Sequence, residues 1–436
     1  MIMRKLSFII LLLSISITIS AEGYQVNLQS NRQTGMGHTG AGQSLGATSI
    51  HFNPGAMGMM NSQFDFSAGG SAVLSSNSFE AGGIKEESDN PTGTPFYVYA
   101  AGKLTDNLVA GIGVTSPFGN SLKWGDEWRG RYLIQDISLQ AIFVQPTLSY
   151  RITDCLSLGA GMSVVFGAVD MNRAISFQAL DPFYQQATQN PSATAPDGQV
   201  NLKGNSVSFG YSAGLYYQIS EKLSVGLGYR SKVEIELDGG DATFTHDEQI
   251  PTFLNMAMAM QGVNLPDNYL FFPDNKFSSM LPMPANLTLG VGWQASDKWF
   301  FAVDLQNVRW SAYKSLDFDF EQNTVTVEDS SMPKNFENTM IYRFGAEYAL
   351  NPSVLLRAGV YYDETPIKDQ YLTPETPGTN KTGLSFGFSW FINEGLSVDA
   401  SILHIMGEER DSTMPLLPGT YNTSAWIPGI GLSYKF

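Results

Sequence analysis

The residue types that carry out catalysis or hold metals do not cluster in this sequence. The four histidines are far apart, and none belongs to an HExxH sequence or a nucleophile motif; they are His38, His51, His246 and His404. The single cysteine, Cys155, cannot form an intramolecular disulfide, and no spacing of His, Cys, Asp and Glu resembles a metal-ligand set. The sequence therefore predicts no catalytic residue, no metal site and no cofactor, and we expect a protein that is not an enzyme.

One glycine motif formally fits a dinucleotide-binding loop. Gly35, Gly37 and Gly40 have the GxGxxG spacing. That fingerprint requires a preceding strand and a βαβ unit, and the surrounding residues predict neither. We therefore interpret these glycines as part of a compact, loop-rich segment.

The residues best suited to bind an apolar ligand gather in the long segment 237–284. They are aromatic and methionine side chains, among them Phe253, Met256, Met260 and Phe271. Such side chains form adaptable apolar surfaces for varied hydrocarbon ligands, and we expect a helical turn here. The alternative interpretation is a small core that only stiffens the loop.

Charge excludes one class of partner. The net charge of −16 repels nucleic acid. Four carboxylates, from Glu80, Glu86, Glu87 and Asp89, mark a solvated first loop, or alternatively one that divalent cations bridge to lipopolysaccharide.

The N-terminus has the features of a secretory signal peptide. Arg4 and Lys5 precede the apolar stretch 6–19, and small residues end at Ala21. This stretch is too short to span a bilayer as a helix. Residues 1–21 are therefore predicted to be removed, and the protein to be exported.

The candidate residues lie on or between predicted strands. Several segments alternate apolar residues with Gly or Ser. The alternation is clearest in 208–215, 384–390, 396–402 and 429–436. A period of two places the apolar residues on one face of a strand. Segments of about ten residues suit tilted strands that cross the hydrocarbon, and Gly and Ser suit a polar lumen. The pattern favours a transmembrane β-barrel over a soluble β-sandwich.

Short polar turns give the number of strands. Six of them separate apolar segments, at 104–108, 152–156, 219–223, 295–299, 350–354 and 392–396. Six turns join twelve strands, and one strand at each end makes fourteen. The sequence thus predicts an all-β fold: a 14-stranded antiparallel barrel over residues 61–436 with long extracellular loops.

Residues 22–60 do not alternate. A fourteen-stranded barrel encloses a lumen that either water or a plug must fill. We therefore expect residues 22–60 to form an N-terminal hatch inside the barrel.

Arg173 is the predicted contact for a ligand's head group. In the strand that begins at Leu156 the even positions are apolar, so odd positions face the lumen, and Arg173 keeps that parity if no bulge intervenes. A buried arginine can hold a carboxylate with two charge-assisted hydrogen bonds. The alternative is an arginine paired with a carboxylate of the barrel.

A break is predicted in the strand that begins at Leu108. Pro117 cannot donate a hydrogen bond to a ladder, and Gly119 adds backbone freedom. We expect a kink at Pro117, Phe118 and Gly119 that opens a lateral exit through the wall. The alternative is that the strand ends at Ser116 and Pro117 begins a loop.

Several short motifs, in this order, resemble the FadL-type family of long-chain fatty-acid transporters, which includes importers of toluene and related aromatic hydrocarbons. The motifs are Gly23-Tyr-Gln-Val26, Asn53-Pro54, Gly130-Arg-Tyr132, Ser149-Tyr-Arg151, Tyr229-Arg-Ser231 and Asp363-Glu-Thr-Pro366. The resemblance covers essentially the whole chain after the signal peptide. It implies a passive outer-membrane importer of hydrophobic compounds, most simply fatty acids, acting as a monomer among outer-membrane lipid and lipopolysaccharide.

The resemblance also implies roles for particular residues. It places Asn53 and Pro54 in the hatch, Tyr24 in the ligand pocket, and Arg173 at a carboxylate-contacting position. It assigns a strand kink to the segment at Pro117. Two other functions stay open: a lipid-directed barrel enzyme using His404 and a serine of the lumen, and a general porin for polar solutes.

Overall fold

The computed structural model describes residues 24–266 and 268–436. The predicted signal peptide, residues 1–21, lies outside the described residues. Among the described residues, no helix has both the length and the apolar character needed to cross a membrane.

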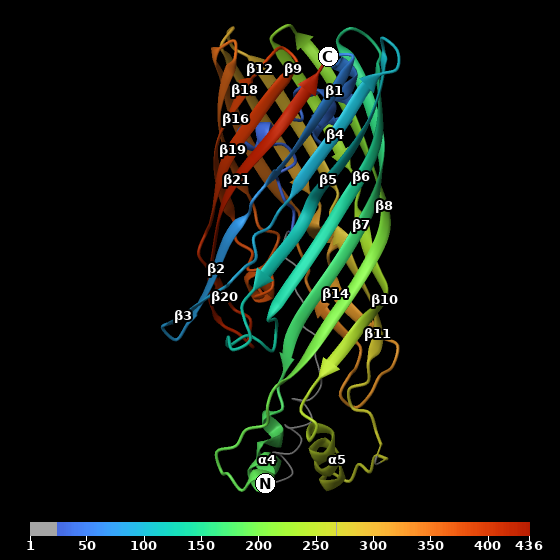
Figure 1. Cartoon of the computed structure of the whole chain (residues 1–436), viewed down its shortest axis with the longest axis vertical. Helices are drawn as coiled ribbons and strands as arrows, with labels where there is room; N and C mark the ends of the chain where they lie inside the picture. The colour runs from blue at the N-terminus through green and yellow to red at the C-terminus, as the bar shows by residue number, and fades with distance from the viewer. Residues whose placement is uncertain (1–23, 267) are drawn as a thin grey trace.

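The chain forms a closed barrel of fourteen antiparallel strands, as predicted (Figure 1). The first strand pairs with the last, from Asp65 opposite Lys435 to Ser71 opposite Gly429. This closure pairs the backbone groups that an open sheet edge would leave unbonded in lipid. All six predicted turns join consecutive strands at one end of the barrel, and the longer loops lie at the other.

Several of the fourteen strands are divided into two segments. In chain order the segments are β1 (Phe64–Ser71), β2 (Leu74–Ala81), β3 (Ile84–Glu87), β4 (Phe96–Lys103), β5 (Leu108–Lys123), β6 (Asp136–Arg151), β7 (Leu156–Ile175), β8 (Gly198–Ser220), β9 (Leu223–Arg230), β10 (Val233–Thr245), β11 (Asn275–Met283), β12 (Asn286–Gln294), β13 (Trp299–Val308), β14 (Ser315–Phe320), β15 (Ser330–Pro333), β16 (Thr339–Asn351), β17 (Val354–Asp363), β18 (Lys381–Phe391), β19 (Leu396–Gly407), β20 (Arg410–Ser412) and β21 (Gly419–Lys435).

The described helices are short, and none of them forms part of the barrel wall. They are α2 (Asn31–Thr34), η1 (Gly46–Thr48), α3 (Ser49–Phe52), η2 (Pro54–Met59), η3 (Gln178–Leu180), α4 (Asp181–Thr188), α5 (Ile250–Met260), η4 (Trp310–Ala312) and η5 (Asp369–Tyr371). The first four belong to the N-terminal segment, and the others belong to the loops opposite the short turns.

The predicted alternation describes the two faces of the wall. On β8, Phe209 is 66% exposed on the outside, whereas Ser208 is buried on the inside. On β18, Phe386 is exposed and Ser385 is buried. The apolar outer face suits contact with lipid, and the small polar inner face leaves room in the lumen.

Strands extend further than the sequence suggested. The loop expected at 237–284 is shorter, because β10 ends at Thr245 and β11 begins at Asn275. The ladder of β10 with β8 and β11 continues beyond the predicted ends of the strands. The backbone groups there form hydrogen bonds with neighbouring strands, so these polar residues belong to strands and not to a loop.

The N-terminal segment fills the lumen as a hatch (Figure 1). We call residues 31–60 the hatch body. Its backbone rests directly on the wall: a Cβ added to Gly226 would lie 1.8 Å from the Ala41 carbonyl oxygen, and one on Gly359 would lie 1.9 Å from the Gly37 nitrogen. Only glycine permits so close an approach.

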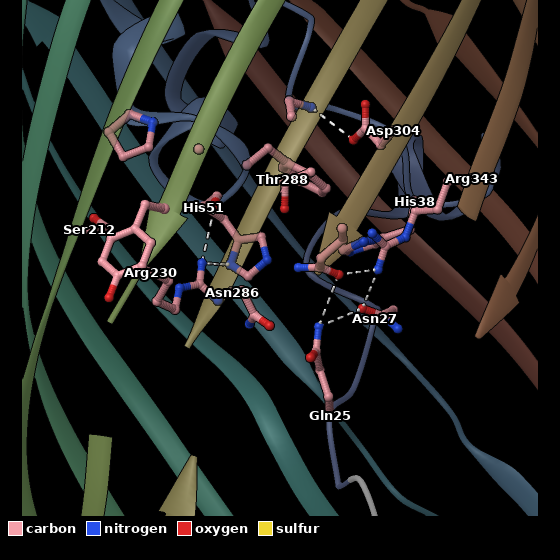
Figure 2. Close-up of a pocket in the computed structure, with 16 residues that line it drawn as sticks. Gln25, Asn27, His38, His51, Ser212, Arg230, Asn286, Thr288, Asp304 and Arg343 are labelled. Atoms are coloured by element: carbon pink, nitrogen blue, oxygen red, sulfur yellow. Dashed lines mark hydrogen bonds between the residues drawn. The ribbon is translucent and has the colours of Figure 1, made fainter. Parts of the chain in front are cut away.

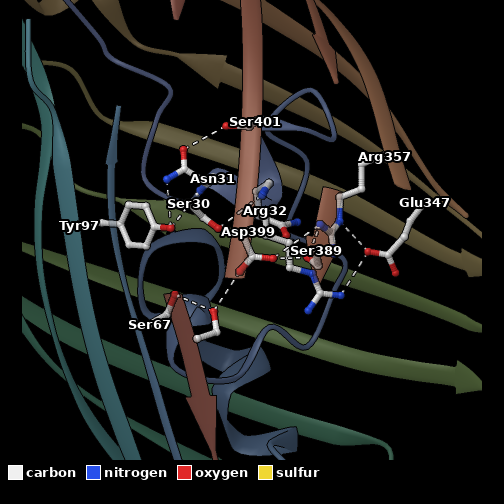
Figure 3. A network of polar contacts seen from close by, with 12 residues as sticks. Ser30, Asn31, Arg32, Ser67, Tyr97, Glu347, Arg357, Ser389, Asp399 and Ser401 are labelled. Atoms are coloured by element: carbon white, nitrogen blue, oxygen red, sulfur yellow. Dashed lines mark hydrogen bonds and ion pairs between the residues drawn. The ribbon is translucent and has the colours of Figure 1, made fainter. Parts of the chain in front are cut away.

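Polar side chains also tie the start of the hatch body to the wall (Figure 3). The Asn31 side-chain oxygen accepts a hydrogen bond from the Ser401 hydroxyl at 3.0 Å. Glu347 binds Arg32 at 3.3 Å and Arg357 at 2.7 Å. Removing one member of such a group leaves a buried charge uncompensated, so the network holds α2 in place.

Candidate ligand-binding site

Two loop helices, α4 and α5, stand together at the extracellular end (Figure 1). The Phe253 ring of α5 packs against the rings of Phe183 and Tyr184, with centroid distances of 5.8 and 4.9 Å. The Tyr184 hydroxyl donates a 2.6 Å hydrogen bond to the Asp247 carboxylate, and this bond lowers the pKa of that carboxyl. The two loops therefore form one packed unit, and the predicted helical turn is confirmed.

The four residues predicted to bind an apolar ligand fall into two groups. Phe253 and Phe271 are buried and build the small core that was the alternative interpretation. Met256 and Met260 are 49% and 74% exposed, so they present an apolar surface to water. Only these two can meet an incoming ligand first, and their role in capture stays a prediction.

Arg173 lies on β7 with its side chain inside the barrel, 4% exposed. The parity argument holds, since Val165 is buried and Phe166 is exposed on the same strand, and the ladder with β8 has no register shift. The ladder partner of Arg173 is the buried, apolar Val200. A guanidinium in such surroundings suits a carboxylate.

The mouth of the barrel contains a second buried cation that sequence reasoning missed. The Lys334 ammonium lies 3.8 Å from the Glu375 carboxylate, and both side chains are 1% exposed. Burial lowers the pKa of Lys334 to about 7, although the nearby Glu375 acts in the opposite direction. Glu375 belongs to the fully buried loop 372–379, which accepts a 2.8 Å hydrogen bond from the Trp124 indole. A single lysine in a loop forms no pattern that could have predicted this.

The predicted kink is confirmed as a bulge in β5. The ladder with β6 shifts register between Thr115 and Phe118, on either side of Pro117. Because β5 continues to Lys123, the alternative that the strand ends at Ser116 is wrong. On its other side, the ladder with β4 stops at Thr115.

A cavity of about 420 Å³ lies where that ladder stops. Its apolar lining comes from the hatch and from several strands: Val26, Phe118, Leu122, Leu139, Ile405 and Ile427. We call it the wall cavity. Its role as the lateral exit stays a prediction.

A short stretch before the hatch body, residues 24–27, lies against the kink; we call it the leading segment. The Val26 amide donates to the Pro117 carbonyl at 2.8 Å, and the Gly119 amide donates to the Tyr24 carbonyl at 3.0 Å. The leading segment thus takes up backbone groups that the interrupted ladder leaves unbonded. The sequence predicted both partners but gave no sign of their contact.

Tyr24 packs against Phe118, a residue that lines the wall cavity. Its hydroxyl donates a 2.6 Å hydrogen bond to the Pro282 carbonyl. Its ring packs edge-on against Phe118 and Trp310, at 6.2 and 5.2 Å between centroids. Tyr24 and Phe118, predicted for different roles, therefore form one contact.

Asn53 and Pro54 lie in the hatch body, as predicted. The Asn53 amide nitrogen donates to the carbonyl oxygens of Ala41 at 2.8 Å and Leu215 at 3.0 Å. Its oxygen accepts the Gly55 amide hydrogen and caps η2. These contacts position the hatch against β8.

His404 cannot join a serine of the lumen in catalysis. Its ring stacks on Trp426, with centroids 4.0 Å apart, and Trp426 is 51% exposed on the outer face. The enzyme alternative therefore loses its candidate histidine.

Comparison with known proteins identifies the family. Residues 12–436 match the family described as outer membrane protein transport protein (OMPP1/FadL/TodX). The chain belongs to this family. The OMPP1/FadL/TodX proteins are transporters of hydrophobic compounds in the bacterial outer membrane, so the chain is a transporter there and not an enzyme.

Relatives in this family cover almost the whole chain. An outer membrane protein of Neisseria meningitidis is 26% identical over 455 residues, covering 96% of each chain. The long-chain fatty acid transport protein of Escherichia coli K12 is 22% identical over 440 residues, covering 95% of this chain and 94% of its own. The crystal structure of a Pseudomonas aeruginosa FadL homologue has a TM-score of 0.79 at 18% identity, covering 95% of this chain and all of its own. The Pseudomonas putida toluene transporter TodX has a TM-score of 0.71 at 18% identity, with the same coverage.

Proposed function

We propose that the protein imports long-chain fatty acids by passive diffusion through a ligand-binding lumen. The observation that carries the proposal is that Arg173 is buried inside the barrel, opposite the apolar Val200 on the neighbouring strand. A neutral hydrocarbon gains nothing from a buried guanidinium, whereas a carboxylate gains charge-assisted hydrogen bonds.

The proposed path has three stages. A fatty acid first meets Met256 and Met260 on α5. It then moves into the mouth, where Arg173 holds its carboxylate. It leaves sideways through the wall cavity at Pro117 and enters the membrane directly.

Replacing Arg173 tests the choice of ligand. Arg173→Ala should weaken fatty-acid binding by about 1.5–3 kcal/mol, the range for a hydrogen bond to a charged group. A neutral hydrocarbon of similar length should lose much less. A suitable control is Arg131→Ala, because Arg131 pairs with Asp197 at 2.8 Å and is partly exposed outside the lumen. Equal losses for both ligands would show that Arg173 is structural.

Transport by the wild-type protein tests the function itself. Cells that make the protein should take up labelled oleate faster than cells that lack it, without chemical change to the oleate. Uptake of toluene but not of oleate would assign the protein an aromatic hydrocarbon instead. A large single-channel conductance in a planar bilayer would favour the porin alternative, because a lumen filled by the hatch should conduct little.

A further inference from the structure

A second, polar pocket lies deeper in the barrel, between the hatch and β9, β12, β13 and β16 (Figure 2). Its volume is about 40 Å³, which suits a head group and not a hydrocarbon chain. We call it the hatch pocket. The residues that define its chemistry are His38, Arg230, Asn286, Asp304 and Arg343.

Positive charge exceeds negative charge in the hatch pocket. Within residues 24–266 and 268–436, neither Arg230 nor Arg343 forms an ion pair with a carboxylate. Arg230 donates to the His51 carbonyl at 3.0 Å, and Arg343 donates to the Gln306 side-chain oxygen at 2.7 Å. Both acceptors are neutral, and Asp304 is the one carboxylate that lines the pocket, so the two guanidinium charges are only partly balanced.

The one carboxylate that lines the pocket, Asp304, also binds the hatch body. One Asp304 oxygen accepts hydrogen bonds from the Gly40 and Ala41 amides, at 2.8 and 3.0 Å. Asp304 therefore serves to hold the hatch body against β13. Two guanidinium groups against one carboxylate leave a net positive charge in the pocket, and this charge favours an anion.

Asn286 supplies the observation that points to a ligand. Its side chain is 4% exposed and projects from β12 into the pocket beside Arg230 (Figure 2). Among the described residues, neither its amide nitrogen nor its amide oxygen has a hydrogen-bond partner, and the same holds for His38 Nε2 and for Nε of both arginines. Buried polar groups are normally hydrogen-bonded, so the donors among them, the Asn286 amide nitrogen and Nε of the two arginines, together define a site for an acceptor.

We propose that the hatch pocket binds the carboxylate head group of the transported ligand, as a second station beyond Arg173. This inference rests on the proposed function, because it concerns the same ligand. The Asn286 amide and the Nε–H groups of Arg230 and Arg343 would donate to the carboxylate. Neither arginine needs to give up its present contact with the hatch or the wall.

The leading segment connects this pocket to an apolar space. Gln25 and Asn27 line the hatch pocket, whereas Val26 lines the wall cavity. A single extended stretch of backbone therefore separates a site for a head group from a site for a hydrocarbon tail. This arrangement favours an amphiphile over a small free carboxylate.

The test follows the carboxyl carbon of ¹³C-labelled dodecanoate by NMR, with the purified full-length protein in micelles of an uncharged detergent. Wild-type protein should give two bound resonances. Asn286→Asp places a fixed carboxylate in the pocket and should remove one of them, and Asn286→Leu should do the same. Arg173→Ala should remove the other. The matched control is Asn422→Asp on the exposed end of β21, which should keep both.

Each failure has its own result. If Asn286→Asp and Asn286→Leu keep both resonances, the hatch pocket holds only water and this inference is wrong. If the wild-type protein binds no dodecanoate, the proposed function itself is wrong. If neither Asn286 variant folds, Thr288→Asp, from the next inward position of the strand, makes the same test. Labelled acetate tests whether the hydrocarbon tail is needed. A bound acetate resonance that Asn286→Leu removes would make the pocket a site for any carboxylate. The absence of such a resonance would show that the tail is required.

Discussion

The hatch body and the leading segment occupy the same lumen, but different contacts hold them. The hatch body, residues 31–60, lies with its backbone on the wall glycines and with α2 tied to charged side chains. The leading segment, residues 24–27, is held at the kink by two backbone hydrogen bonds and by the side chain of Tyr24. Regions with few buried contacts open at the lowest cost. We therefore expect the leading segment to move during transport while the hatch body stays in place.

The largest effect should come from disrupting the contact between the hatch body and the wall glycines. In Gly226→Val the new Cβ would overlap the Ala41 carbonyl, and no rotamer can relieve that overlap. We expect a loss of about 3 kcal/mol or more, at the upper end for overpacking, and little folded protein by heat-modifiable gel mobility. Gly102→Ala is the control, because its Cβ would lie 3.6 Å from the nearest atom. Normal folding of Gly226→Val would show that the hatch body does not pack tightly against the wall at this glycine.

Locking the leading segment should stop transport without unfolding the barrel. Gln25 and Phe118 lie opposite each other in an antiparallel bridge, and the hydrogen bonds on either side are made by their neighbours. Such a non-hydrogen-bonded pair brings the two Cα atoms close enough for a disulfide. In a Cys155→Ser background, Gln25→Cys with Phe118→Cys should lower oleate uptake to that of cells without the protein, and a reductant should restore it. The two single-cysteine variants control for the lost side chains. Full uptake with the bond formed would mean that the leading segment does not need to move.

A smaller effect should appear at capture, upstream of both regions. Changing Met256 and Met260 to Ser removes exposed apolar surface worth on the order of 1 kcal/mol per methionine to a bound chain. Capture from dilute fatty acid should slow, while release from preloaded protein stays the same. Stopped-flow fluorescence with a labelled fatty acid measures both rates. An unchanged capture rate in folded protein would assign capture to another surface.

The smallest effect concerns pH at the loop unit. The bond from Tyr184 holds the pKa of Asp247 below its usual value of 3.8, so the stability that it contributes is present above that value. This contribution is lost as the pH falls through the lowered pKa. Hydrogen-exchange protection of α5 should therefore decrease below about pH 4. In Asp247→Asn the decrease should vanish, and the protection of the hatch body should be the same in both proteins.

The sequence predicted the features that depend on neighbouring residues. Alternation and short turns are local, so the barrel, its fourteen strands and the inward side of Arg173 followed from them. The buried face of α5 could also have been predicted, because Ile250, Phe253 and Leu254 have the spacing of one face of a helix. Contacts between distant segments were not predictable. Nothing near Tyr24 or Lys334 in the chain indicates Phe118 or Glu375 as a partner.

The wall glycines have a consequence for the permeability of the cell. At Gly226 and Gly359 the wall has no side chains, and the hatch body takes their place as the inner lining of the barrel. Removing the hatch body would therefore open a pore wider than the strand number alone requires, lined there by bare backbone. Antibiotics and other polar molecules could then leak through. Under the proposed function, a small leading segment beside a fixed hatch body would let hydrocarbon pass sideways while the outer membrane stays closed to these molecules.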